Sequence, residues 1–384
     1  MKNKQVRTAA WIGLAVLCVV YGPMAIEYMM RFFFPSAPSL WDGTFAAVVG
    51  DRIVYGEGSI HTDQHAAYEN SLGWLLVHTV LGGLAILLGI TQFSQRFRTR
   101  YLRIHRRIGR AQVTIVIISM IGAIGYLVRT GPEGTFSGPA FYLQLWALAL
   151  ATLATSILAV VAIVRGHVRT HQALMAVNFA LLLSAPLLRI GYLLFGLAWP
   201  DMTHSVINVA SGEVVPIVLF LGAVFAIRAA DTRRVSIVNQ PIVVPPWVSR
   251  TIYATSAVAL ISLGAAVSVY IGGIDRLLAA HLVAYLIALV VVAAMRRQAL
   301  RDGDLLGAAE WRVIHLGLAA GPAAFGILWA VYAIPFSTSE AFYGATLTGV
   351  AVTLFAAYGV VAWNRRVIKP ANTGSAARQP VMRP

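Results

Sequence analysis

The chain is poor in cysteine and in charged residues. Cys18 is its single cysteine, so an intrachain disulfide is impossible, and we expect no thiolate metal site. Only 12% of the residues are charged, with 15 acidic residues against 30 lysines and arginines. No Walker loop, GxSxG elbow or dinucleotide fingerprint stands in a credible setting. These absences argue against an ATP-driven pump or a serine hydrolase built on those motifs.

The chain is instead rich in long apolar stretches. Hydrophobic residues make up 58% of the chain, and its mean hydropathy is +0.74, which is typical of a polytopic membrane protein. A membrane-crossing helix needs roughly 20 apolar residues, so the sequence predicts an all-α bundle of about ten spans. We place the spans at residues 8–33, 73–93, 111–129, 140–164, 172–195, 213–230, 251–272, 277–295, 312–333 and 342–363.

The basic residues are distributed unevenly between the connections. Seven arginines fall within residues 96–110 alone. If the N-terminus is cytoplasmic, alternate connections together hold 25 of the 30 lysines and arginines. The positive-inside rule therefore predicts that both termini face the cytoplasm, in a bacterial cytoplasmic membrane. The basic residues of these connections account for the net charge of +15, and we expect no nucleic-acid partner.

Two polar connections organise the predicted spans. Residues 34–72 are too polar to insert and are expected to cap the outer face. Residues 231–250 carry three prolines and predict a stiff cytoplasmic linker. The expected units are a six-helix membrane domain (1–230, with a core at 78–189), this linker, a four-helix membrane domain (251–363) and a disordered cytoplasmic tail (364–384).

Five ionisable residues fall at one depth, near the outer ends of the predicted spans. Such residues are costly within a bilayer and are therefore candidates for function. One interpretation is an ion pair between Arg189 and either Glu27 or Glu213 that holds helices together. The other is an outward-facing pocket, for a small amphipathic substrate or for a haem bound by histidine. The five residues are Glu27, His78, Arg189, Glu213 and His281.

A second group of histidines lies at the predicted cytoplasmic surface. His105 and His171 enter the bilayer at equal depth on the third and fifth spans, as the ligands of a b-type haem would. His78 and His281 are further candidate ligands. Three arginines beside His105 would either neutralise the haem propionates or contact anionic lipid headgroups. These arginines are Arg106, Arg107 and Arg110.

Three segments together carry a family pattern. They are HTVLGGLAILLGITQF (78–93), RYLRIHRRIGR (100–110) and THQALMAVNFALLLSAPLLR (170–189). This pattern resembles the uncharacterised bacterial membrane family known as domain of unknown function 2306. The chain departs from it at Ala111 and Gln112, where an aromatic residue is usual, and at Gln172, where a basic residue is usual. The resemblance implies a membrane protein and says nothing of activity.

The histidines also show a fold-level likeness to cytochrome b561-type four-helix cores, in which histidines of alternate helices pair across the bundle. His105 and His171 match one such pair, whereas His78 has no partner on the fourth span. Two functions therefore stay open. One is a b-haem protein that moves electrons between a quinol and an outer acceptor. The other is a transporter or export-accessory protein that uses the outer residues around His78 and Arg189.

Overall fold

The computed structural model describes residues 2–34, 36–231, 235–236, 242–367 and 369–370. Over these ranges the chain is an all-α bundle with nine helices that are long and apolar enough to cross a membrane. A bent pair of shorter helices, α10 (Val168–Leu182) and α11 (Ser184–Ala198), supplies a tenth span if the pair counts as one. The prediction of a polytopic helix bundle with about ten spans is confirmed.

The remaining helices fall into long spans and short connecting elements. The spans are α1 (Lys2–Met30), α6 (Leu72–Gln92), α8 (Leu102–Thr130), α9 (Gly138–Val164), α12 (His204–Ala230), α13 (Pro246–Ala266) with the π-helical turn η1 (Val267–Ile271), α14 (Arg276–Arg301), α15 (Leu305–Ala319) followed by α16 (Gly321–Tyr332), and α17 (Thr338–Asn364) with the 3-10 turn η2 (Arg365–Val367). The short elements are α2 (Leu40–Val49), α3 (Asp51–Tyr55), α4 (Ile60–Asp63), α5 (His65–Asn70), α7 (Gln95–Arg100) and the antiparallel pair β1 (Val235–Ser236) and β2 (Lys369–Pro370).

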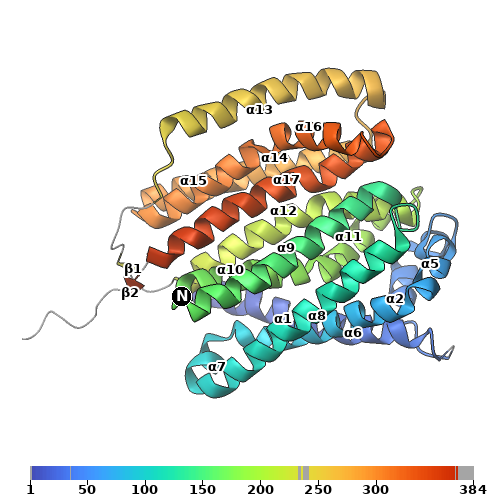
Figure 1. The fold of residues 1–384 in the computed structure, drawn as a ribbon, viewed down its shortest axis with the longest axis horizontal. Coiled ribbons are helices and arrows are strands. Elements are labelled where there is room, and N and C mark those ends of the chain that lie inside the picture. Colours follow the sequence, from blue (N-terminus) through green and yellow to red (C-terminus); the bar gives the residue numbers. More distant parts are fainter. Residues whose placement is uncertain (1, 35, 232–234, 237–241, 368, 371–384) are drawn as a thin grey trace, which may run out of the picture.

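The two ends of the bundle differ in character (Figure 1). Helices α2 and α5, in blue, lie at one end, which we call the outer end. Helix α7 and the β1–β2 pair lie at the opposite end, which we call the inner end. The arginine-rich segment 96–110 begins in α7 and continues into the first turns of α8, so its charges lie at the inner end.

The helices before and after the predicted linker share one hydrophobic core. Helix α17 packs against α9 and α12, and one cluster of buried side chains draws on both parts of the chain. Its members include Ala159, Ala173, Val224, Val292, Ile314 and Leu354. Helix α13 instead lies along one edge of the bundle, where it contacts α15 and α16 (Figure 1). The site described below is therefore walled by the central helices and not by α13.

Parts of two predicted units lie outside the described residues. In the linker these are residues 232–234 and 237–241, and in the tail they are residues 368 and 371–384. Pro246 opens α13 at its first helical position, where its fixed φ angle suits a helix and its missing N–H costs nothing.

The orientation in the membrane is directly testable. Since the arginine-rich segment 96–110 lies at the inner end, we expect a reporter fused after Pro384 to give a cytoplasmic signal. A reporter inserted within residues 231–250 should give the same signal. Paired alkaline phosphatase and green fluorescent protein fusions would measure this, and a periplasmic signal at either position would contradict the assigned orientation.

Candidate functional site

A cavity of about 580 Å³ opens beneath the outer cap of the bundle. Helices α1, α6, α8, α9, α11 and α12 form most of its wall. On α1, α6, α8 and α11 the lining residues mostly repeat every three or four positions and lie on one face of the helix, whereas α9 contributes the continuous run 147–152. Examples are Tyr21, Met24, Ala25 and Tyr28 on α1, Leu75, His78, Thr79 and Gly82 on α6, and Ala185, Leu188, Arg189 and Tyr192 on α11. The lining faces mainly the interior of the bundle, and it also reaches exposed positions such as Leu150 and Val352.

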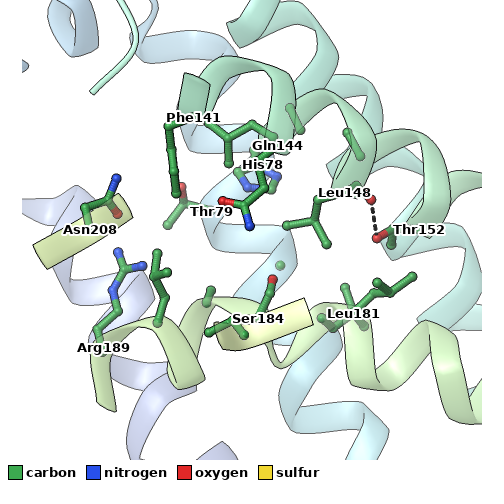
Figure 2. A pocket seen from close by; sticks show the side chains of 18 of the residues that line it. His78, Thr79, Phe141, Gln144, Leu148, Thr152, Leu181, Ser184, Arg189 and Asn208 are labelled. Carbon is green, nitrogen blue, oxygen red and sulfur yellow. Dashed lines mark hydrogen bonds between the residues drawn. The ribbon is translucent and has the colours of Figure 1, made fainter. Parts of the chain in front are cut away.

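Arg189 is the single arginine or lysine among the described residues that line this cavity. Its side chain is half-buried and lines the wall, and Figure 2 shows its guanidinium turned into the cavity on the side of Asn208. The rings of Tyr21 and Tyr192 lie nearby, each with its centroid 5.8 Å from the guanidinium carbon. Within the part of the chain that the structure describes, no carboxylate oxygen lies within 4.0 Å of Arg189. Its positive charge is therefore not neutralised by an ion pair.

The two acids considered as partners of Arg189 lie elsewhere. Glu27 is buried, and neither of its carboxyl oxygens has a hydrogen-bond partner among the described residues. Glu213 accepts a hydrogen bond from the Thr346 hydroxyl at 2.8 Å, which joins α12 to α17. Neither acid lines the cavity. The structure thus shows neither of the ion pairs that the sequence suggested.

His78 is held in one tautomer by the neighbouring helix. Its Nδ1 lies 3.2 Å from the carbonyl oxygen of Ser119, and a carbonyl can only accept a hydrogen bond. Nδ1 therefore carries the proton, which leaves Nε2 as an acceptor. Glycine at position 122 permits this contact, because a Cβ there would lie 2.8 Å from the backbone nitrogen of His78. Close packing of α6 on α8 thus orients this wall residue.

Gln144 lines the cavity at a position that depends on a proline in α12. Pro216 has no N–H, so the carbonyl of Gly212, four residues earlier, loses its partner within the helix. The Gln144 side-chain amide donates to that carbonyl at 2.5 Å instead. In a membrane a freed carbonyl must find such a partner inside the protein. One hydrogen bond therefore ties α9 to α12 and places Gln144 beside the cavity.

His204 is a wall residue that the sequence analysis missed. It opens α12, is only 3% exposed, and has no hydrogen-bond partner at either ring nitrogen among the described residues. The rings of Phe45, Phe136 and Tyr192 surround it, with centroids 5.0, 5.2 and 4.8 Å away. The spacing of His204 and Asn208, four apart on one helix face, was a signal that could have identified both.

The outer cap contributes an acid that is already neutralised. Asp42 lies 2.6 Å from the Arg31 guanidinium and 3.1 Å from the His61 Nε2. Burial raises the pKa of this carboxyl, but the hydrogen bond from His61 and the charge of Arg31 outweigh it, so the pKa falls below its usual 3.8. Asp42 and His61 both line the cavity. The cap is thereby joined to the end of α1, since Arg31 directly follows that helix.

The other candidate residues are distributed through the bundle. His171 is half-buried and its Nδ1 lies 2.9 Å from the Ala159 carbonyl, while the half-buried His105 is close enough to interact electrostatically with it. His281 stacks on Tyr285 with an interplanar angle of 8°. None of these three histidines lines the cavity. The arginines flanking His105 are exposed at the inner end, namely Arg106, Arg107 and Arg110.

Of the five residues predicted at one depth, the cavity brings together His78 and Arg189. Depth along the helix axis is a single coordinate, and the rotation of each helix decides which side chains face one another. Tyr21 and Tyr28 face the cavity from α1, for example, whereas Glu27, between them in sequence, does not.

Comparison with known proteins supports the family resemblance. Residues 75–225 match the family described as Predicted membrane protein (DUF2306), which confirms the likeness drawn from residues 78–189. The matched region contains α7 to α11 with parts of α6 and α12, and therefore His78, Gln144, Arg189 and His204. No curated protein and no solved structure matches the chain.

Proposed function

We propose that the protein is a transporter or export-accessory protein that binds an amphipathic molecule in the outer cavity. The observation that carries this proposal is the division of the cavity into a polar and an apolar part. Arg189 and Asn208 lie toward one side of the close-up and Leu148 and Leu181 toward the other (Figure 2). A volume of about 580 Å³ is within the range of sites that enclose small organic ligands.

The apolar part of the cavity reaches between the central helices. Its wall there is built from aliphatic and aromatic side chains of α9, α10, α12 and α17. These include Leu148, Leu181, Leu219, Phe220, Ala351 and Phe355. A hydrocarbon chain in this part would leave contact with water, worth about 25 cal/mol for each Å² buried. A molecule with one polar end and one apolar end matches both halves of the wall.

Two interruptions in the wall helices resemble the broken helices of secondary transporters. Helices α10 and α11 meet at a bend of 42° around Leu183, and the adjoining Leu182 and Ser184 line the cavity. Pro216 interrupts the hydrogen bonding of α12 at the same cavity. Broken helices at a binding site are common in secondary transporters, where they mark substrate sites and absorb conformational change.

Filling the cavity tests the proposal. We expect Ala185→Trp, which places an indole in the cavity wall, to reduce binding of fluorescent dansyl-labelled twelve-carbon probes by about tenfold or more. Both a neutral and a carboxylate probe would be titrated against protein in nanodiscs. Ile190→Trp on the exposed face of the same helix is the matched control, since it adds the same side chain outside the cavity. Unchanged binding of both probes to folded Ala185→Trp protein would contradict the proposal.

A second candidate function is electron transfer through a b haem held by His105 and His171. The supporting observation is the contact of the His171 Nδ1 with Ala159, which fixes the tautomer and leaves Nε2 available to a metal, as is usual for histidine ligands. A b haem, when bound, supplies one-electron transfer. We expect protein purified from haem-supplied cells to show a b-type absorption spectrum that is lost in His105→Ala and His171→Ala and kept in His78→Ala. Colourless, folded wild-type protein would rule this candidate out.

A further inference from the structure

We infer that the cavity takes an amphiphile with an anionic head, a carboxylate or a phosphate monoester on an apolar chain, and that Arg189 binds this head. The inference rests on the proposed function, because it assigns the substrate class of the same cavity. It is carried by the balance of charge and of hydrogen-bond donors around Arg189.

The charge around the cavity is unbalanced. Of the described residues that line it, Arg189 is the single arginine or lysine and Asp42 the single acid. Asp42 is already held by Arg31 and His61 in the cap, at 2.6 and 3.1 Å. The two rings near Arg189 offer only cation–π contact, which cannot replace a counterion. Among the described residues that line the cavity, Arg189 therefore has no acidic counterion.

An unpaired guanidinium within a bilayer span is energetically costly. The cost is offset when an anion completes a charge-assisted hydrogen-bonded pair, and the planar guanidinium suits the two oxygens of a carboxylate or phosphate. A neutral head group would leave the charge unpaired, and a cationic head group would add repulsion. The site therefore favours an anion over both alternatives.

Further hydrogen-bond donors in the lining also favour an anionic head group. Tyr21, Tyr28 and Tyr68 line the cavity, and their hydroxyls make no hydrogen bond with another described residue. His204, almost fully buried in the lining, likewise has no partner at either ring nitrogen in the described part of the chain, so its one ring N–H is free to donate. Asn208 is different, because its side chain is occupied by Tyr192 and Ser137. A head group rich in acceptor oxygens would satisfy these free donors. The lining also holds an acceptor without a hydrogen-bond partner among the described residues, Gln144 Oε1, so the donor count supports the argument from charge and does not replace it.

Four probes with the same twelve-carbon chain separate head-group charge from chain burial. Dodecanoate, dodecyl phosphate, dodecan-1-ol and dodecyltrimethylammonium would each be titrated against the full-length protein in nanodiscs, with thermal unfolding as the readout. We expect the preferred anion to bind about 10- to 100-fold more tightly than the alcohol, as a charge-assisted hydrogen bond implies, and the ammonium not to bind. Comparison of dodecanoate with dodecyl phosphate identifies which anion is preferred.

The matched variants are Arg189→Gln and Arg129→Gln. Arg189→Gln should remove the preference for the anion, while Arg129→Gln, which changes an exposed outer-end arginine outside this cavity, should keep it. If Arg189→Gln does not fold, competition between dodecanoate and dodecan-1-ol on the wild-type protein decides the question. Equal affinity of alcohol and anions, still lowered by Ala185→Trp, would overturn the inference and leave the proposed function standing. No binding of any probe would overturn both.

Discussion

Replacing Arg365 with alanine is expected to destabilise the folded protein by about 3 to 5 kcal/mol, because it breaks a buried ion pair and leaves the carboxylate behind. Arg365 is 3% exposed, and its Nε and one terminal nitrogen lie 2.7 and 2.8 Å from the two oxygens of the fully buried Glu310. The same terminal nitrogen lies 2.8 Å from Asp231. After the change, Glu310 would retain only Arg228, at 3.3 Å.

The position of this cluster explains why its loss should affect the whole molecule. Asp231 follows α12, Glu310 lies in α15 and Arg365 follows α17, so the pairs fasten the inner ends of helices from both parts of the chain. Urea or thermal unfolding in detergent would measure the loss. The neighbouring Arg366 provides the control, since it is exposed and stacks on Trp363 at 3.9 Å, so Arg366→Ala should cost less than about 1 kcal/mol. Equal effects of the two variants would contradict the assigned role.

Replacing Arg189 with alanine is expected to have the largest effect on ligand binding and little effect on folding. If the ion pair with Glu27 or Glu213 that the sequence suggested were present, this change would strand an acid and cost several kcal/mol. No carboxylate lies within 4.0 Å of Arg189 in the described residues, however, so no charge is stranded when it is removed. We therefore expect the ligand-free variant to unfold within about 1 kcal/mol of the wild type or to be more stable.

Ligand-induced stabilisation should respond in the opposite way. Arg189→Ala should abolish the stabilisation that dodecanoate gives to the wild-type protein, and Arg189→Lys should keep part of it, because a lysine preserves the charge but not the two-pronged geometry. The two measurements are unfolding with and without dodecanoate in the same nanodiscs. A large loss of ligand-free stability in Arg189→Ala would instead mean that the residue holds the helices together.

The spans could be predicted from sequence because hydropathy reports long apolar runs directly. The runs at 73–93 and 140–164 correspond closely to α6 and α9. The run at 213–230 was too short, because α12 already begins at His204. Its polar first turns are buried inside the bundle, and a hydropathy pattern cannot distinguish a polar residue sheltered by other helices from one in water.

The candidate site could be predicted only in part, for a geometric reason. Arg189 and His78 could be identified because ionisable residues are rare within predicted spans, and both line the cavity. Gln144 was missed because its position depends on a carbonyl freed by Pro216 on another helix. His204 was missed because it stands at a helix start, next to a polar connection, where a histidine is unremarkable in sequence. Contacts between helices far apart in the chain decide both positions, and no local pattern contains them.

The most direct test of the central claim is the site of covalent labelling by a photoactivatable hexadecanoate with a diazirine in its chain. The account predicts labelling of peptides from the apolar wall, around Leu181, Leu219 and Phe355, and its suppression by excess dodecanoate. Helix α13 provides the internal control, since Val258 and Ile261 are 65% and 77% exposed and face the surroundings of the bundle. Labelling confined to α13 and other outward faces, and insensitive to dodecanoate, would show that the probe only partitions into lipid and would contradict a binding site in the cavity.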